Sequence, residues 1–243
     1  MRLRLIGALV AVVVMATAAA AAFAAKPATS TCAGGLIGAG TYQGLTVTGT
    51  CFFDNVTSQD PTITIDGNLT IAPGASLNAH AGTTASVTVT GNVLVGQGGT
   101  LGLGSYGGPT GTVVDGNIVA DQPQSLYLAF LTIHGNLVSQ GGTAAGPFTN
   151  FPIKNLTVGG NVTLEGWSGF WIGLFRSTVG GNVFFANNTG TNPDSSEVAN
   201  NTISGNLICS GNNPAVQFGD SGGGPNTVGG HAVGQCAAFA QTP

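Results

Sequence analysis

The sequence predicts an all-β protein, a solenoid of about nine coils in which short strands repeat with a period of 18–25 residues. Three observations lead to this prediction. The dipeptide Gly-Asn recurs along the chain, the residues before it repeat in type, and glycine is abundant (41 of 243 residues) while only 6% of residues are charged. Self-similarity at such a period is typical of solenoid architectures.

The Gly-Asn dipeptide divides the chain into units. Gly and Asn tolerate left-handed backbone conformations best, so we expect each dipeptide to turn one coil through a corner. We also expect the stacked Asn amides to hydrogen-bond one another along the inside of that corner. The dipeptides are Gly67-Asn68, Gly91-Asn92, Gly116-Asn117, Gly135-Asn136, Gly160-Asn161, Gly181-Asn182 and Gly205-Asn206, with degenerate copies at Gly49-Thr50 and Gly230-His231.

Two columns of residues precede the glycines and predict the faces of a strand. The position two residues before each Gly is β-branched and apolar, and we expect it to point inward. The position three residues before is Thr in all repeats except one, and we expect it to point outward because strand side chains alternate. The inward column is Val47, Ile65, Val89, Val114, Ile133, Val158, Val179, Ile203 and Val228. The outward column is Thr46, Thr64, Thr88, Val113, Thr132, Thr157, Thr178, Thr202 and Thr227.

Each repeat of about 24 residues therefore contains three short strands and three turns. From residue 44 to about residue 236, this pattern resembles the right-handed parallel β-helix proteins of the pectin-lyase-like kind. The resemblance implies a three-sided cross-section with an internal Asn stack. It implies no single function, because that fold is shared by lyases, hydrolases, phage tailspikes and adhesins.

The N-terminus predicts export. Arg2 and Arg4 precede an apolar run that ends in small residues before Lys26, which is typical of a secretory signal peptide. We expect a signal peptide over 1–25, an N-terminal cap segment over 26–43, the β-helix over 44–236 and a C-terminal tail over 237–243. The mature protein is then extracellular and contacts no membrane.

The net charge of the chain limits the kinds of partner that it can bind. Removal of the signal peptide leaves three cationic residues against nine acids, a formal net charge of −6. Such a chain is a poor partner for nucleic acid. We expect no cofactor and no metal ion, and the sequence leaves the oligomeric state open.

The four cysteines lie at the two ends of the repeat region. Export implies an oxidising compartment, in which an even number of cysteines indicates disulfides. Cys51 and Cys209 are separated by roughly seven coils, about 34 Å at a strand spacing of ~4.8 Å. A disulfide holds the Cα atoms within about 7 Å. Of the three possible pairings we therefore predict Cys32 with Cys51 and Cys209 with Cys236.

The position directly before each Gly offers a candidate catalytic strip. Asp115 and His134 fall on adjacent rungs, about 4.8 Å apart, and Asp66 lies two rungs below Asp115. A carboxylate beside an imidazole can act in general acid and base catalysis, and two carboxylates about 9.6 Å apart approach the spacing of inverting glycosidases. The alternative is turn chemistry with a solvated ion pair. The β-helix enzymes that the chain resembles carry a cluster of acids or of basic residues, which this chain lacks.

Aromatic residues offer a candidate site for polysaccharide or cell-surface glycan. Counting from the Gly places Tyr127 and Trp171 in one outward column, two rungs apart, with Trp167 in the preceding turn and Arg176 close by. Exposed rings at that spacing can stack on sugar rings. The alternative is that the rings cover apolar surface or belong to the core after an error of register.

Two further features stay open. The Thr column resembles the ladders of ice-binding proteins, although a second Thr column does not form beside it. Residues 187–201 are interpreted as an inserted loop able to bind a cation or a partner. We predict a non-catalytic extracellular scaffold or surface protein that binds glycan, with a carbohydrate-active enzyme and an ice-binding protein as alternatives.

Overall fold

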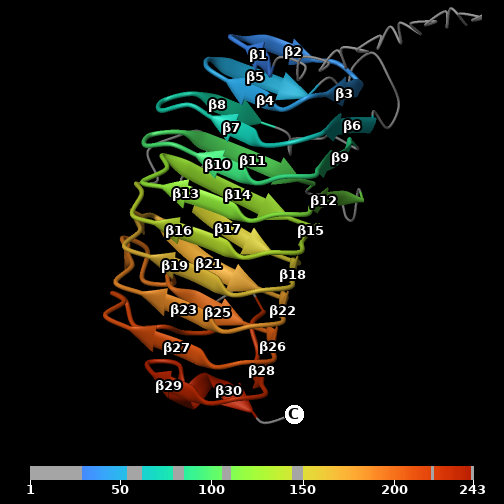
Figure 1. Ribbon diagram of the computed structural model, residues 1–243. Coiled ribbons are helices and arrows are strands. Elements are labelled where there is room, and N and C mark those ends of the chain that lie inside the picture. The colour runs from blue at the N-terminus through green and yellow to red at the C-terminus, as the bar shows by residue number, and fades with distance from the viewer. Residues whose placement is uncertain are drawn as a thin grey trace, which may run out of the picture.

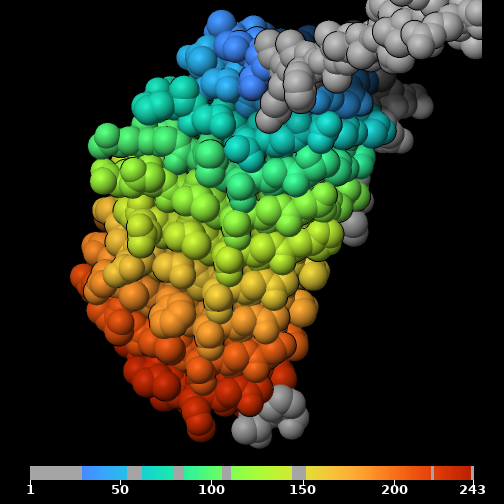
Figure 2. Space-filling model, in the orientation of Figure 1, coloured from blue at the N-terminus to red at the C-terminus, as the bar shows by residue number. Residues whose placement is uncertain are grey.

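A computed structural model describes residues 29–53, 62–78, 85–105, 111–143, 150–219 and 222–241. The strands pair in parallel and stack into an elongated solenoid (Figure 1). In Figure 2 the colours of the chain follow one another in bands down the molecule, so successive coils lie side by side. The predicted all-β solenoid of stacked parallel strands is confirmed, and two of its three sheets contain ten strands each.

Three parallel sheets form the three faces of the solenoid, and each coil contributes a strand to each face. Sheet A has ten strands: β1 (Ser30–Cys32), β4 (Leu45–Val47), β7 (Leu69–Ile71), β10 (Val93–Val95), β13 (Ile118–Asp121), β16 (Leu137–Gln140), β19 (Val162–Glu165), β23 (Val183–Ala186), β27 (Leu207–Ser210) and β29 (Ala232–Gly234). Sheet B has eight: β2 (Gly35–Ile37), β5 (Thr50–Phe53), β8 (Ser76–Asn78), β11 (Thr100–Gly104), β14 (Ser125–Ala129), β17 (Asn150–Lys154), β21 (Trp171–Phe175) and β25 (Glu197–Ala199).

The third face and the short elements complete the described structure. Sheet C has ten strands: β3 (Gly40–Tyr42), β6 (Thr62–Ile65), β9 (Ser86–Val89), β12 (Thr112–Val114), β15 (Leu131–Ile133), β18 (Thr157–Val158), β22 (Thr178–Val179), β26 (Thr202–Ile203), β28 (Asn226–Val228) and β30 (Ala240–Gln241). A two-stranded sheet joins β20 (Ser168–Gly169) to β24 (Thr189–Gly190), and one 3-10 helix, η1, spans Ala237–Phe239.

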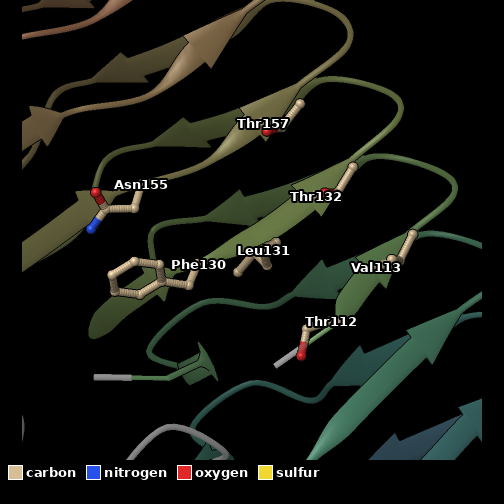
Figure 3. A pocket seen from close by; sticks show the side chains of 8 residues that line it. Thr112, Val113, Phe130, Leu131, Thr132, Asn155 and Thr157 are labelled. Carbon is tan, nitrogen blue, oxygen red and sulfur yellow. The ribbon is translucent and has the colours of Figure 1, made fainter. Parts of the chain in front are cut away.

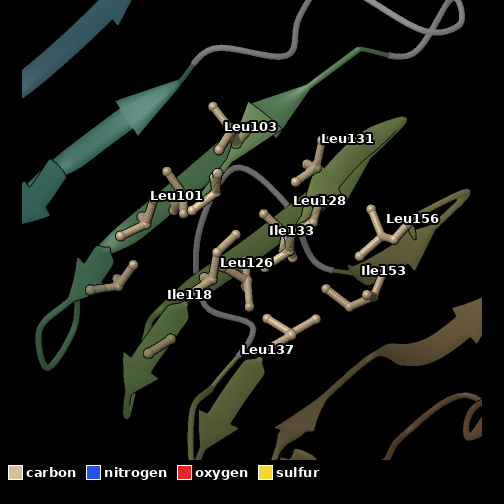
Figure 4. Packing of buried hydrophobic residues seen from close by; sticks show 14 of the residues in the cluster. Leu101, Leu103, Ile118, Leu126, Leu128, Leu131, Ile133, Leu137, Ile153 and Leu156 are labelled. Atoms are coloured by element: carbon tan, nitrogen blue, oxygen red, sulfur yellow. The ribbon is translucent and has the colours of Figure 1, made fainter. Parts of the chain in front are cut away.

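The core is the apolar space that the three sheets enclose. Leu101, Leu126, Leu128, Ile133 and Leu137 point into it from successive strands (Figure 4). The predicted inward column from Ile65 to Val228 is buried throughout. Full burial of such a side chain contributes about 1.5–3 kcal/mol, so the stacked columns provide the main stabilisation.

The predicted position of the first repeat, with its corner at Gly49-Thr50, is wrong. Thr46 and Val47 lie in sheet A, opposite Thr70 and Ile71. The residues in register with Thr64 and Ile65 are Thr41 and Tyr42. Gly49-Thr50 therefore lies between sheets A and B. The sequence around it imitates the repeat, but the corner equivalent to Gly67-Asn68 falls at Gln43-Gly44, because the backbone N–H of Leu45 donates to the Asn68 carbonyl at 2.9 Å.

The dipeptides do turn the chain, at the corner between sheets C and A, which we call the Gly-Asn corner. The glycines of these dipeptides are required because the neighbouring coil leaves no room for a side chain. Of the seven, only Gly67 has a positive φ (132°). A Cβ at Gly135 would lie 2.6 Å from Asn117 Oδ1 and 2.6 Å from the Gly116 carbonyl oxygen, closer than any side chain allows. The predicted reason for these glycines is therefore wrong: they permit the close approach of successive coils.

Left-handed residues occupy the other two corners instead. At the corner from sheet A to sheet B, Gln122 and Asn187 have φ values of 44° and 57°. At the corner from sheet B to sheet C, a stack of non-glycine residues with positive φ follows successive coils. These are Phe130, Asn155, Arg176 and Asn200, with φ between 46° and 57°.

The Asn ladder at the Gly-Asn corner is confirmed in its hydrogen bonds and corrected in its position. From Asn117 to Asn206, each side-chain Nδ2 donates to Oδ1 of the Asn on the preceding coil at 2.9–3.3 Å. The backbone N–H of Asn92 donates to Asn68 Oδ1 at 2.9 Å. These side chains are half-buried or exposed, so the ladder runs along the surface of the corner and not inside it.

Both ends of the solenoid are closed by the predicted disulfides. Cys32 pairs with Cys51 and Cys209 with Cys236, with Cα separations of 6.5 and 5.3 Å. Strands β1, β2 and β3 already belong to the three sheets, so the region predicted as a cap forms the first coil. At the other end, η1 and β30 fall within the predicted tail, and β30 extends sheet C. The predicted signal peptide lies outside the described residues.

Candidate functional site

The predicted polar strip lies at the Gly-Asn corner, directly after the strands of sheet C. Asp115 Oδ1 and His134 Nδ1 are 3.0 Å apart, and their side chains are 45% and 60% exposed. The expectation that these two residues are neighbours is confirmed. Asp66 interacts elsewhere: its Oδ1 accepts a hydrogen bond from Thr90 Oγ1 at 3.2 Å. The structure therefore brings together two of the three candidates, at an exposed corner of the solenoid.

No group of three or more His, Cys, Asp or Glu residues able to hold a metal ion occurs within the described ranges. A search of the same residues finds no helix with the length and apolarity needed to cross a membrane.

The predicted aromatic column does not form. In sheet B, Leu128 pairs with Ile153 and Pro152 with Gly173, so Gly173 lies in the column of Tyr127, while Trp171 pairs with Asn150. The error has a simple cause. Leu128, Ile153 and Leu174 share one column but lie 12, 18 and 14 residues after their corner glycines, so a fixed offset fails.

Two of the four predicted glycan-binding residues are buried. Tyr127 is 0% exposed and Trp167 is 2% exposed, and Trp167 belongs to the core cluster. Neither ring offers a face to a sugar in this structure. The alternative interpretation, rings that cover or join the core, describes them correctly.

The other two predicted residues lie together on the outer side of sheet B. Trp171 is half-buried, its ring stacks on Phe175 with centroids 5.4 Å apart, and its Nε1 donates to Glu197 Oε1 at 2.9 Å. Both rings fold over Gly173, where a Cβ would lie 2.4 Å from the Trp171 ring. Arg176 is exposed, and its guanidinium carbon is 5.7 Å from the Phe175 ring centroid.

Sequence reasoning missed Lys154 as a partner of this group. Lys154 is the last residue of β17 and pairs with Phe175, the last residue of β21. Arg176 follows Phe175 directly. Its Nζ is 5.9 Å from the centroid of the Tyr127 ring. Burial, and secondly the positive charge of Arg176, lower the pKa of Lys154. The two side chains thus share one electrostatic environment.

A cavity of about 210 Å³ lies at the corner from sheet B to sheet C, and one of its lining residues, Asn155, follows Lys154 in the sequence. Figure 3 shows the side chains of Phe130 and Asn155 near one another at this corner, with Thr132 and Thr157 farther along their strands. The lining is neutral, and consists of Gly111, Thr112, Val113, Phe130, Leu131, Thr132, Asn155 and Thr157.

The interpretation of residues 187–201 as an inserted loop is wrong. They contain β24 and β25, and β25 pairs with β21 in sheet B. Within the segment, the backbone N–H of Asp194 donates to Asn192 Oδ1 at 3.0 Å, and Gln217 Nε2 donates to the Ser195 carbonyl at 2.9 Å. The segment is built into the coil.

The outward Thr column is confirmed from Thr64 to Thr227, and Thr41 takes the place predicted for Thr46, which lies in sheet A. Pairing along sheet C places Thr41 below Thr64 and continues to Thr227, with Val113 interrupting the column. All of these side chains are partly or fully exposed.

These features place the chain in the class of parallel β-solenoid proteins. No family model, no curated protein and no solved structure matches it. The assignment therefore rests on the fold.

Proposed function

We propose that this protein is an exported, non-catalytic β-solenoid, an extracellular scaffold or surface protein that binds glycan on its outer faces. The predicted signal peptide supports export, and the two disulfides are compatible with an oxidising compartment. The resemblance to the pectin-lyase-like β-helix proteins, which include adhesins, supports a role as a surface protein by analogy of fold.

One observation carries the non-catalytic part of the proposal. The Asp115–His134 pair lies at the Gly-Asn corner, on the surface, with both side chains about half exposed. Catalysis by such a pair requires further groups that converge on the substrate and a pocket that excludes water. Asp66, the third candidate, is hydrogen-bonded to Thr90 instead. An exposed ion pair of this kind contributes little to the free energy of folding.

The test is a panel of neutral and acidic polysaccharides incubated with the purified protein, with retention and newly released sugar ends scored in the same tubes. We expect retention without release, and no effect of Asp115→Asn on either. Release that disappears in Asp115→Asn would support the carbohydrate-active enzyme instead. Absence of both retention and release would contradict the glycan-binding function.

Ice binding is a second candidate because of one observation. Eight Thr residues present a hydroxyl and a methyl group on nine consecutive strands of sheet C, at a spacing of about 4.8 Å. The measurement is thermal hysteresis with Thr157→Tyr, and Thr163→Tyr on sheet A serves as the control. Hysteresis that only the first substitution abolishes would support this candidate. Absence of hysteresis in the unmodified protein would exclude it.

A further inference from the structure

The two cationic side chains of the described residues lie on neighbouring strands. Of the five Lys and Arg residues in the chain, Lys154 and Arg176 are those within the described ranges. Lys154 pairs with Phe175, and Arg176 follows Phe175 directly. Adjacent strands are about 4.8 Å apart, so the backbones of the two residues lie on adjacent coils at the same corner.

Both cations are held near aromatic rings. Lys154 Nζ is 5.9 Å from the Tyr127 centroid, and Arg176 Cζ is 5.7 Å from the Phe175 centroid. These distances are within the range of cation–π interaction, which steadies a long side chain without neutralising its charge. The pair therefore forms a positioned positive patch on an acidic protein.

The backbone at Arg176 is a second observation. Its φ of 46° is in the left-handed region, which Asn tolerates and Arg adopts rarely. The residues above and below it in this corner stack, Asn155 and Asn200, are both Asn. An Arg at this position costs stability because its backbone is strained. Such costs gather at functional positions.

Proximity of the two cations is itself unfavourable. Burial and the Arg176 charge lower the pKa of Lys154, so the charged form of Lys154 is disfavoured. Arg176 makes no ion pair with any residue in the described part of the chain. An anion between the two side chains would remove the repulsion. Arg in particular binds planar oxyanions in a bidentate manner.

The neutral cavity beside the pair suits the remainder of a ligand. Asn155, which lines the cavity, follows Lys154 in sequence and lies between Phe130 and Arg176 in the corner stack. Its lining combines one aromatic ring with hydroxyl and amide groups (Figure 3). These hydroxyl and amide groups can hydrogen-bond to the hydroxyl groups of a neutral sugar.

We propose that Lys154 and Arg176 bind one oxyanion, a carboxylate or sulfate, of an acidic saccharide whose neutral part occupies the cavity beside Phe130 and Asn155. This inference rests on the proposed glycan-binding function. Two cations match a single anionic group. A polyanion would find no third Lys or Arg along the described faces and would be repelled by the excess of acids.

The experiment measures affinity by calorimetry with the full mature chain and three probes: an oligosaccharide with one terminal uronate, its neutral methyl ester, and a polyuronate. A sulfated analogue of the first probe distinguishes sulfate from carboxylate. The variants are Arg176→Asn, which suits the left-handed backbone, and Lys154→Met. The control is Ser204→Asp, which makes the net charge more negative by one unit at an exposed position directly after β26.

We expect the singly acidic probe to bind best, and each cation variant to weaken it by about tenfold to a hundredfold, as for a lost charged hydrogen bond. Ser204→Asp should leave the affinity within about twofold. Thermal unfolding of each variant checks that the fold is intact.

Equal binding of the acid and its neutral ester, or an affinity unchanged in both cation variants, would overturn the assignment of this site while leaving glycan binding in place. Tighter binding of the polyuronate, compared per uronate, would overturn the single-anion part. Failure of every saccharide in the panel and in calorimetry would overturn the proposed function as well.

Discussion

Ladders of side-chain amides run along the exposed Gly-Asn corner and, separately, inside the other two corners. In the exposed ladder, Asn136 Nδ2 donates to Asn117 Oδ1 at 2.9 Å, and both side chains are half-buried. In a buried ladder, Asn201 Nδ2 donates to Asn226 Oδ1 at 2.8 Å, and these residues are 1% and 0% exposed. The hydrogen bonds are alike, while the access of water differs.

A second buried ladder lies at the corner from sheet A to sheet B. Asn188 Nδ2 donates to Asn212 Oδ1 at 3.0 Å, and Asn212 Nδ2 donates to Gln235 Oε1 at 2.8 Å. A half-exposed amide that loses its partner can bond to water, whereas a buried group left without a partner costs about 1–3 kcal/mol. Each residue of the ladder at the Gly-Asn corner therefore contributes less to the free energy of unfolding than a residue of the two short buried ladders.

The largest effect should come from Asn201→Ala. This change removes the acceptor of the Ser177 N–H and the donor to the Leu174 carbonyl, both buried. Two such groups at about 1–3 kcal/mol each lower the free energy of unfolding by about 2–6 kcal/mol. Urea denaturation measures the loss. A loss below 1 kcal/mol would remove the distinction between the two kinds of ladder.

Removal of the C-terminal disulfide should come next. Cys236 follows Gln235, the last member of the buried A-to-B ladder, and the disulfide closes a segment with a sequence separation of 27. Replacing Cys209 and Cys236 by Ser should cost about 2–4 kcal/mol. Hydrogen exchange at the Asn212 amide should accelerate. The same replacement at Cys32 and Cys51 is the control and should leave Asn212 protected.

Gly135→Ala tests why the exposed corner contains glycine. The added Cβ would lie 2.6 Å from Asn117 Oδ1, so the coils must move apart, at a cost of about 1–3 kcal/mol. Gly38→Ala is the control, because no atom lies within 4 Å of a Cβ at Gly38. Thermal unfolding of the two variants compares them. Equal stability would contradict the steric explanation.

Asn136→Ala should have the smallest effect. It leaves the backbone N–H of Asn161 without its Oδ1 acceptor, but water reaches this corner. We expect a loss of about 0.5–1.5 kcal/mol in the free energy of unfolding. The comparison with Asn201→Ala uses the same substitution and the same denaturation assay, so an equal loss in both would show that burial is not decisive here.

The repeating pattern predicted the architecture because it depends on local periodicity. Inward Val and Ile columns, outward Thr and a corner every 18–25 residues specify strands that must stack to bury their apolar face. The Asp115–His134 contact followed for the same reason, since both residues directly precede the corner glycine of their coil. The disulfide pairing followed from the distance between the ends of the stack.

The candidate binding site depends on register in sheet B, where the number of residues between corner and strand varies from coil to coil. The same variation hid the burial of Tyr127 and the proximity of Lys154 to Arg176. The buried ladders carry a sequence signal, Asn188 to Asn212 and Asn201 to Asn226 at separations of 24 and 25, but two members do not stand out as a repeat.

By itself, the sequence determined the parallel solenoid, its inward and outward columns, the hydrogen bonds of its Gly-Asn corner ladder and its two disulfides, because each follows from a fixed spacing along the chain. Only the tertiary structure decided which aromatic rings are buried, which cations meet, and that the corner glycines serve close approach of the coils and not a left-handed turn. Those properties depend on atoms of neighbouring coils, whose alignment is set by hydrogen-bond register and packing across the stack.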